Sequence, residues 1–152
     1  MNDKSRTLQD FTSAHIPRCL EIFDANCPQY FAPNERDDYL EFLNDPIPTY
    51  QVVLLGEVIV GGVGLSPSVQ NRARLSWILL DPTLQKSGIG AFIMDTVITR
   101  SKQQHIEIVD IAASHLSEPF FARFGATRQQ YIEHGWGPEM HKVDMTLSIA
   151  AV

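Results

Sequence analysis

The chain has 152 residues, of which 44% are apolar, and this is enough to fill one hydrophobic core without support from a metal or a disulfide. The formal net charge of -6 argues against nucleic acid as a partner, because a phosphate backbone is bound by clustered Lys and Arg. Two cysteines are present, Cys19 and Cys27, and we expect both to be reduced thiols. No apolar run has the form of a signal peptide or a membrane span, so we expect a cytoplasmic protein with no membrane partner.

The first half of the chain predicts a strand, two helices and then a meander of strands. Apolar residues recur at helical spacing after Thr12 and again after Asn34, whereas β-branched residues flank a tight turn at Gly56 and Glu57. The expected elements are a strand over residues 5–11, helices over 12–25 and 34–44, and strands over 50–55, 58–65 and 72–80. A meander of this kind predicts an antiparallel sheet.

The second half predicts helices and strands in alternation. Ile89, Ile93 and Val97 recur at helical spacing, and Gly125 is the residue type that ends a helix in a left-handed conformation. The expected elements are a helix over residues 88–104, a strand over 106–113 that is buried on both faces, a helix over 117–124, and strands over 127–133 and 140–149 around a loop at 135–138. The whole order predicts an α/β (α+β) fold, in which a mixed sheet carries helices on its faces.

The segment from Gln85 to Gly90 joins an expected strand to an expected helix. A helix N-terminus binds anions, and Gly88 and Gly90 lack side chains that would block a phosphate, while Lys86 adds a donor. The spacing excludes a nucleotide P-loop, and Ile93 stands where a dinucleotide fingerprint needs Gly or Ala. On this turn alone, both a phosphate site and an ordinary connection with small residues stay open.

Two motifs in this order resemble those of the GNAT superfamily of acetyl-CoA-dependent N-acetyltransferases. Gln85, Gly88 and Gly90, which follow a strand end at residues 79–82, are similar to the family pattern Gln/Arg-x-x-Gly-x-Gly/Ala. Residues 114–126 are similar to the second motif of the family. The order of elements also matches, so the resemblance covers nearly the whole chain.

The resemblance implies both an architecture and an acyl donor. One domain is expected over residues 1–152, with a mostly antiparallel central sheet that splays between the strands ending at Leu80 and Ala113. Acetyl-CoA is expected in this opening, where the backbone of Ile78 and Leu80 holds the pantetheine arm and the N–H of Leu80 faces the thioester oxygen. The residues implied for binding acetyl-CoA are Ile78, Leu79, Leu80, Gln85, Lys86, Ser87, Gly88, Ile89, Gly90, Ala91, Ser114, Phe121 and Arg123.

Three of these residues have simpler alternatives. Ser114 either bonds the pantetheine arm or ends its strand, Phe121 packs on the cofactor or in the core, and Arg123 reaches a phosphate or solvent. Phe121 also stands where many family members have a tyrosine that protonates the departing thiolate. The chain therefore departs from the family at the general acid.

The catalytic candidates are Leu80, His134 and Glu133. The N–H of Leu80 meets the need for an oxyanion donor, and a base must take a proton from the attacking amine. His134 is preferred over Glu133 because an imidazole titrates near neutrality. Each of the two is more commonly a surface or core residue than a base.

Aromatic residues beside prolines lie between the first two helices, where relatives build a substrate lid. The predicted substrate-binding residues are Tyr30, Phe31, Glu35 and Trp136. A packed loop followed by a helix start, with Asn34 as its cap, is the alternative. No metal site is expected.

The function implied by the resemblance is transfer of an acetyl group from acetyl-CoA to a primary amine, by direct attack in a ternary complex. The amine belongs to a small molecule or a peptide, and the acidic surface weakly favours such cationic partners. A non-catalytic acyl-CoA sensor and an interaction module are the alternatives. Whether the chain acts as a monomer or as a homodimer is left open.

Overall fold

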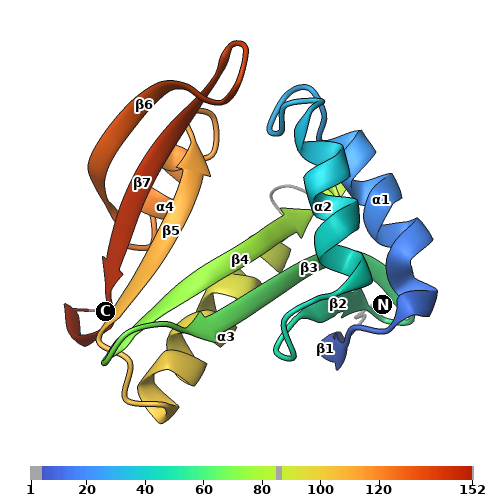
Figure 1. Cartoon of the computed structure of the whole chain (residues 1–152). Helices are drawn as coiled ribbons and strands as arrows, with labels where there is room; N and C mark the ends of the chain where they lie inside the picture. The colour runs from blue at the N-terminus through green and yellow to red at the C-terminus, as the bar shows by residue number, and fades with distance from the viewer. Residues whose placement is uncertain (1–4, 85–86, 152) are drawn as a thin grey trace.

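The computed structural model describes residues 5–84 and 87–151, and it confirms the expected order of helices and strands (Figure 1). The strands are β1 (Arg6–Asp10), β2 (Gln51–Leu55), β3 (Val58–Pro67), β4 (Arg72–Leu80), β5 (Ile108–Ser114), β6 (Thr127–Gly137) and β7 (Met140–Ser148). The helices are α1 (Ile16–Ala25), α2 (Glu35–Asn44), α3 (Ile89–Gln103) and α4 (Glu118–Ala122), with short 3₁₀ segments η1 (Ser13–His15), η2 (Pro82–Leu84) and η3 (Ile149–Ala151). The strands form a 7-stranded sheet in the order β1-β2-β3-β4-β5-β7-β6.

The sheet is antiparallel except where β4 meets β5. These two strands pair in parallel only where residues 72–74 face residues 108–110. At this end, where the two strands are paired, the Arg72 guanidinium donates to both carboxylate oxygens of Asp110, at 3.1 and 2.5 Å. Beyond it the two strands diverge, as Figure 1 shows for the labelled arrows of β4 and β5. The expected mostly antiparallel sheet, splayed between β4 and β5, is therefore confirmed.

Helices cover both faces of the sheet, and each face has its own core. On one face α3 and α4 bury residues such as Ile93 and Phe121 against the strands. On the other face α1 and α2 bury Phe23 and Tyr39. The side chain of Leu79 belongs to the second core, whereas its neighbours in β4 contact the first, as the alternation of a strand requires. The end of β4 is thus held between the two cores.

The hairpin at the end of the sheet differs from the expected loop at residues 135–138. Strand β6 continues to Gly137, which pairs with Met140, so the turn contains only two residues. The extra residues are absorbed by a register shift between Ile132 and Gly137, and His134 lies there at a positive φ of 55°. Glycines mark bulges as well as loops, and the sequence pattern does not separate the two.

Strand β5 also differs from the expectation that it is buried on both faces. It begins at Ile108, and its buried residues Val109, Ile111 and Ala113 point to the α3 face. On the opposite face Ala112 is exposed and Asp110 is half-buried. The reason is that α1 and α2 pack over β2 and β4, where the second core lies.

No described helix has both the length and the apolar composition that a membrane span requires.

Candidate functional site

A β-bulge lies in β4 beyond its last pair with β5. Gly62 faces Leu79 and Gly64 faces Ser76, so two residues of β4, Trp77 and Ile78, stand opposite a single residue of β3. Trp77 has a φ of 44°, in the left-handed region that bulky residues avoid. A bulge of this type bends and twists its strand. Of the two residues whose backbone was expected to hold the pantetheine arm, Ile78 therefore lies in the bulge and Leu80, whose N–H was expected to face the thioester oxygen, follows it.

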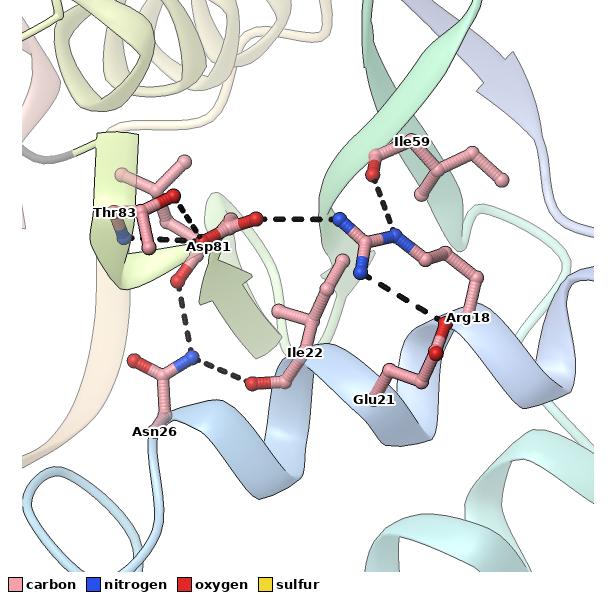
Figure 2. Close-up of polar contacts among 8 residues, drawn as sticks. Arg18, Glu21, Ile22, Asn26, Ile59, Asp81 and Thr83 are labelled. Carbon is pink, nitrogen blue, oxygen red and sulfur yellow. Dashed lines mark hydrogen bonds and ion pairs between the residues drawn. The ribbon is translucent and has the colours of Figure 1, made fainter.

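A polar network ties the end of β4 to helix α1 (Figure 2). The side-chain amide of Asn26 donates to the carbonyl oxygens of Leu80, at 3.0 Å, and of Ile22, at 2.8 Å. The next residue, Asp81, accepts a hydrogen bond from Arg18 Nη2 at 3.2 Å. Sequence reasoning did not identify these contacts, because α1 and β4 are far apart in the chain. They fix the position at which β4 stops.

Asp81 also starts the connection toward α3. Its Oδ1 accepts hydrogen bonds from the backbone N–H of Thr83 at 3.0 Å and from the Thr83 hydroxyl at 2.8 Å. Partial burial raises the pKa of Asp81, but the bonds from Thr83 and Arg18 outweigh burial and the pKa lies below its ordinary value. The carboxylate therefore stays ionised and acts as an acceptor. The Asp-Pro dipeptide at residues 81–82 is the local signal for such a turn.

The N-terminus of α3 has the form of an anion site. Gly88 is the N-cap residue, with a φ of 87° that requires glycine, and both Ser87 and Gly88 are exposed. The guanidinium of Arg6, from β1, donates to the carbonyl oxygen of Ser87 at 3.1 Å. Sequence reasoning missed Arg6 because it lies in another strand. Gln85 and Lys86, which were assigned to this site, lie outside the described residues.

Gly90 and the buried Ile89 have packing reasons that the sequence did not reveal. A Cβ atom on Gly90 would lie 2.7 Å from Cε1 of Phe120, so the glycine lets α4 approach α3. Ile89 is fully buried in the first core and has only its backbone available to a ligand. The guanidinium carbon of Arg123 lies 5.6 Å from the centroid of the Phe120 ring. Phe120 thus contacts both Arg123 and the first turn of α3, on which Ala91 is exposed.

Ser114 and Phe121 have protein partners. The backbone N–H of Ser114 donates to the Ser117 hydroxyl at 3.0 Å, and the N–H of Ser117 donates to the Ser114 hydroxyl at 3.1 Å. This reciprocal pair ends β5 and starts α4, which was the simpler of the two alternatives for Ser114. Phe121 is 3% exposed and packs in the first core, so its ring does not line an open surface.

Trp136 lies where the two diverging halves of the sheet are bridged. Its indole N–H donates to the carbonyl oxygen of Ala113 at 2.9 Å, at the end of β5. Its own carbonyl oxygen accepts a hydrogen bond from the side-chain amide of Asn34 at 2.8 Å. In the alternative with a helix start at this point, Asn34 does occupy the N-cap position of α2, but its side chain makes this bond to Trp136 and no cap bond. The β6–β7 hairpin and the α1–α2 connection therefore meet at the same end of the molecule (Figure 1).

Glu35 ties the start of α2 to the turn that precedes it. Its carboxylate accepts a hydrogen bond from the N–H of Ala32 at 2.8 Å, and its own N–H donates to the Ala32 carbonyl at 2.9 Å. This reciprocal pair closes the turn at residues 32–35, from which α2 starts. Burial raises the pKa of Glu35 to about 7, although the Ala32 N–H acts in the opposite direction. Glu35 is 4% exposed, so its carboxylate binds the α1–α2 connection from within the protein and does not face solvent.

The two aromatic candidates of this connection are half-buried. The ring of Phe31 lies 5.1 Å from that of Phe23 and 6.3 Å from that of Trp77, measured between centroids. Phe31 therefore contacts the bulged residue of β4. The backbone N–H of Tyr30 donates to the carbonyl oxygen of Asn26 at 2.7 Å, which closes the turn after α1.

Three histidines cluster on the β6–β7 hairpin and its neighbour. The rings of His115 and His134 lie 4.6 and 4.9 Å from that of His141. The Nδ1 of His134 accepts a hydrogen bond from the N–H of Glu139 at 2.9 Å, and its Nε2 lies 3.6 Å from a carboxylate oxygen of Glu133. Within residues 5–84 and 87–151, no hydrogen bond or ion pair joins His134 or Glu133 to β4. The structure thus places both catalytic candidates on the hairpin and brings neither into direct contact with Leu80.

Comparison with known proteins agrees with this architecture. A model of the acetyltransferase (GNAT) family matches residues 17–126. Among solved structures, Ard1 from Thermoplasma volcanium is 15% identical, with 94% of this chain and 97% of that chain covered and a TM-score of 0.77. A ribosomal-protein-alanine N-acetyltransferase from Brucella melitensis is 16% identical, with 93% and 99% covered and a TM-score of 0.67. A spermidine N-acetyltransferase SpeG chimera from Vibrio cholerae and hSSAT is 12% identical, with 96% of both chains covered and a TM-score of 0.73. The search of curated proteins returned no match.

The match to the family model covers most of the chain, and the sheet splays between β4 and β5 beside a glycine-capped helix. The chain belongs to the GNAT acetyltransferase family. It is therefore assigned to the acyltransferases. The identities to the solved structures are low, so those structures establish the fold alone.

Proposed function

We propose that this protein transfers an acetyl group from acetyl-CoA to a primary amine, by direct attack within a ternary complex. The observation that carries the proposal is the divergence of β4 from β5 next to the exposed N-terminus of α3. An opened sheet leaves backbone groups of β4 without a strand partner, and the helix terminus favours a phosphate. The two features together fit a ligand that has an extended amide arm and a pyrophosphate.

The phosphate end of the ligand is assigned to the N-terminus of α3. The first turn of α3, which starts at the exposed Gly88, would meet the pyrophosphate, while the N–H of Ser87 already donates to the carbonyl oxygen of Leu84. The guanidinium of Arg6 lies at this terminus through its bond to Ser87, and Arg123 is proposed as a second phosphate contact because it lies against Phe120, which packs on Gly90. Guanidinium groups bind phosphates strongly.

The thioester end is assigned to the backbone at Ile78, in the bulge, and at Leu80, just after it. In this assignment the N–H of Leu80 stabilises the oxyanion that forms when the amine nitrogen attacks the carbonyl carbon. The C–S bond then breaks, and the thiolate of CoA leaves. A thiol has an ordinary pKa of about 8.5, so its anion departs without an acid catalyst. This fits the absence of a hydroxyl at the buried Phe121.

The acceptor amine is assigned to the end where the β6–β7 hairpin meets the α1–α2 connection. Phe31 and Trp136 supply apolar surface there, and the net charge of -6 attracts cationic amines. Neighbours in fold carry names that specify a ribosomal-protein alanine and spermidine as acceptors, which supports an amine as the substrate class. His134, with Glu133 beside it, is the proposed base; its basic nitrogen is Nδ1, which must release the N–H of Glu139 before it takes the proton of the amine.

Two measurements test this function. Acetyl-CoA at about 100 times its Kd is expected to stabilise the chain by about 2.7 kcal/mol, and a panel of amines is expected to release free thiol. The Arg123→Ala variant should weaken acetyl-CoA binding about tenfold, because it loses a charge-assisted phosphate contact, while Arg74→Ala is a control from the other end of β4. Stabilisation without thiol release for any amine would favour the sensor, which the lack of an acid at Phe121 also permits. No stabilisation would refute the assignment of the site.

A further inference from the structure

The side chain of Tyr50 runs across β3 to reach the bulge in β4. A Cβ atom on Gly62 would lie 2.5 Å from the Tyr50 hydroxyl oxygen, and one on Gly64 would lie 3.0 Å from Cδ1 of the Tyr50 ring. The two glycines therefore leave the space in which this ring lies. They also bracket the register shift of β3 against β4. The Gly-rich sequence of β3 and the bulge are thus parts of one arrangement.

The Tyr50 hydroxyl donates a hydrogen bond to the carbonyl oxygen of Trp77 at 2.8 Å. A hydroxyl has one proton, so in the 2.9 Å contact between the two phenol oxygens it is Tyr39 that donates to Tyr50. Both side chains are 1% exposed, and burial raises the pKa of each, so both stay protonated. The result is a buried relay from α2, through Tyr50, to the bulged peptide.

Trp77 needs such support. Its φ of 44° is unfavourable for a side chain of this size. Its ring packs against those of Tyr39, at 4.8 Å, and Phe42, at 6.2 Å, measured between centroids, and its carbonyl is held by Tyr50. A strained peptide persists only where its surroundings fix it, and here the ring contacts and the Tyr50 bond do so.

We propose that Tyr50 is a positioning residue for acetyl transfer, which acts through Trp77 on the backbone of Ile78, Leu79 and Leu80. The inference rests on the proposed function, because it assumes that this backbone binds the thioester. Tyr50 is buried and touches no reacting atom. Its hydrogen bond fixes the orientation of the Trp77–Ile78 peptide, and the direction of the following N–H groups depends on that orientation.

The test compares Tyr50→Phe with Tyr39→Phe. Each variant loses one buried hydroxyl, but only Tyr50→Phe removes the bond to Trp77. We expect both variants to fold with similar losses of thermal stability. We expect Tyr50→Phe to lower kcat about 10- to 100-fold, since small misplacements at a reacting centre have effects of this size, while the KM for the amine stays within about threefold. Tyr39→Phe should keep kcat within about threefold of the wild type.

A second readout does not depend on activity. Amide hydrogen exchange at residues 77–80 should accelerate in Tyr50→Phe and not in Tyr39→Phe. Equal kcat and equal exchange in the two variants would overturn the inference. If the wild type neither binds acetyl-CoA nor releases thiol, the proposed function fails, and exchange still reports whether Tyr50 holds the bulge. Should Tyr50→Phe not fold, Gly62→Ala displaces the same hydroxyl and is expected to give the same exchange pattern.

Discussion

The two halves of the proposed site are built in different ways. The donor half, at β4 and the start of α3, consists of residues close in sequence, and its key atoms belong to the backbone. The acceptor half is assembled from the α1–α2 connection and the β6–β7 hairpin, which are joined by the bond of Asn34 to Trp136. Backbone geometry follows from local patterns that many sequences share, whereas the acceptor half depends on individual side chains. A donor site can therefore be proposed from local sequence patterns, whereas the acceptor cannot.

The largest expected effect tests whether the acceptor half carries the base. Replacing His134 by Gln should lower kcat about 100-fold and remove the rise of rate with pH that an imidazole base produces. His115→Gln is the matched control, because its ring belongs to the same cluster and lies next to His141. An equal loss in both variants, or an unchanged pH–rate profile in His134→Gln, would show that the cluster is structural.

Glu35 either supports the turn at the start of α2 or contacts substrate, and its replacement separates the two roles. Its pKa is about 7 in the folded chain and 4.5 ordinarily, so the folded state binds the proton more tightly. The free energy of unfolding should therefore fall as the pH rises from about 4.5 to about 7. Glu35→Gln lacks this fall and should be more stable than the wild type above pH 7, by up to about 3 kcal/mol.

Chemical denaturation at several pH values measures this difference. Near pH 4 the two proteins should have similar stability, since the carboxyl is then protonated in both states. Glu133→Gln is the control for stability, because that side chain is 74% exposed and its replacement should leave the free energy of unfolding nearly unchanged at each pH. If Glu35 only supports this turn, the Glu35→Gln variant should keep the KM of the wild type for the amine. A raised KM with no pH-dependent stabilisation would instead favour contact with substrate.

The smallest expected effect tests the donor half. Gly90→Ala places a methyl group against Phe120 and should lower the free energy of unfolding by about 1–3 kcal/mol. Phe120→Leu in the same chain removes the clash, so the double variant should regain most of this loss. If stability is regained and acetyl-CoA affinity is not, Gly90 serves both helix packing and the phosphate. Unchanged stability in Gly90→Ala would contradict the packing role.

The sequence predicted the elements well and the irregularities poorly. The order of strands and helices and the splay of the sheet are confirmed. The extent of β6 and the burial of β5 were wrong, because a bulge near Gly135 has the composition of a loop and because the helix cover over β5 is a tertiary property. The alternative with Asn34 as cap gave its position at the start of α2, but not the bond of its amide to a strand about a hundred residues away.

By itself, the sequence determined the family and supports the proposed place of the donor site, since both depend on short motifs whose geometry is local: a strand end, a turn and a glycine at positive φ. Only the tertiary structure decided which side chains support that site. Arg6 reaches it from β1 and Tyr50 from the residue before β2, and Gly62 is explained by the ring that it admits. Such contacts join residues far apart in the chain, and their partners are chosen by how the two cores pack, which no local pattern records.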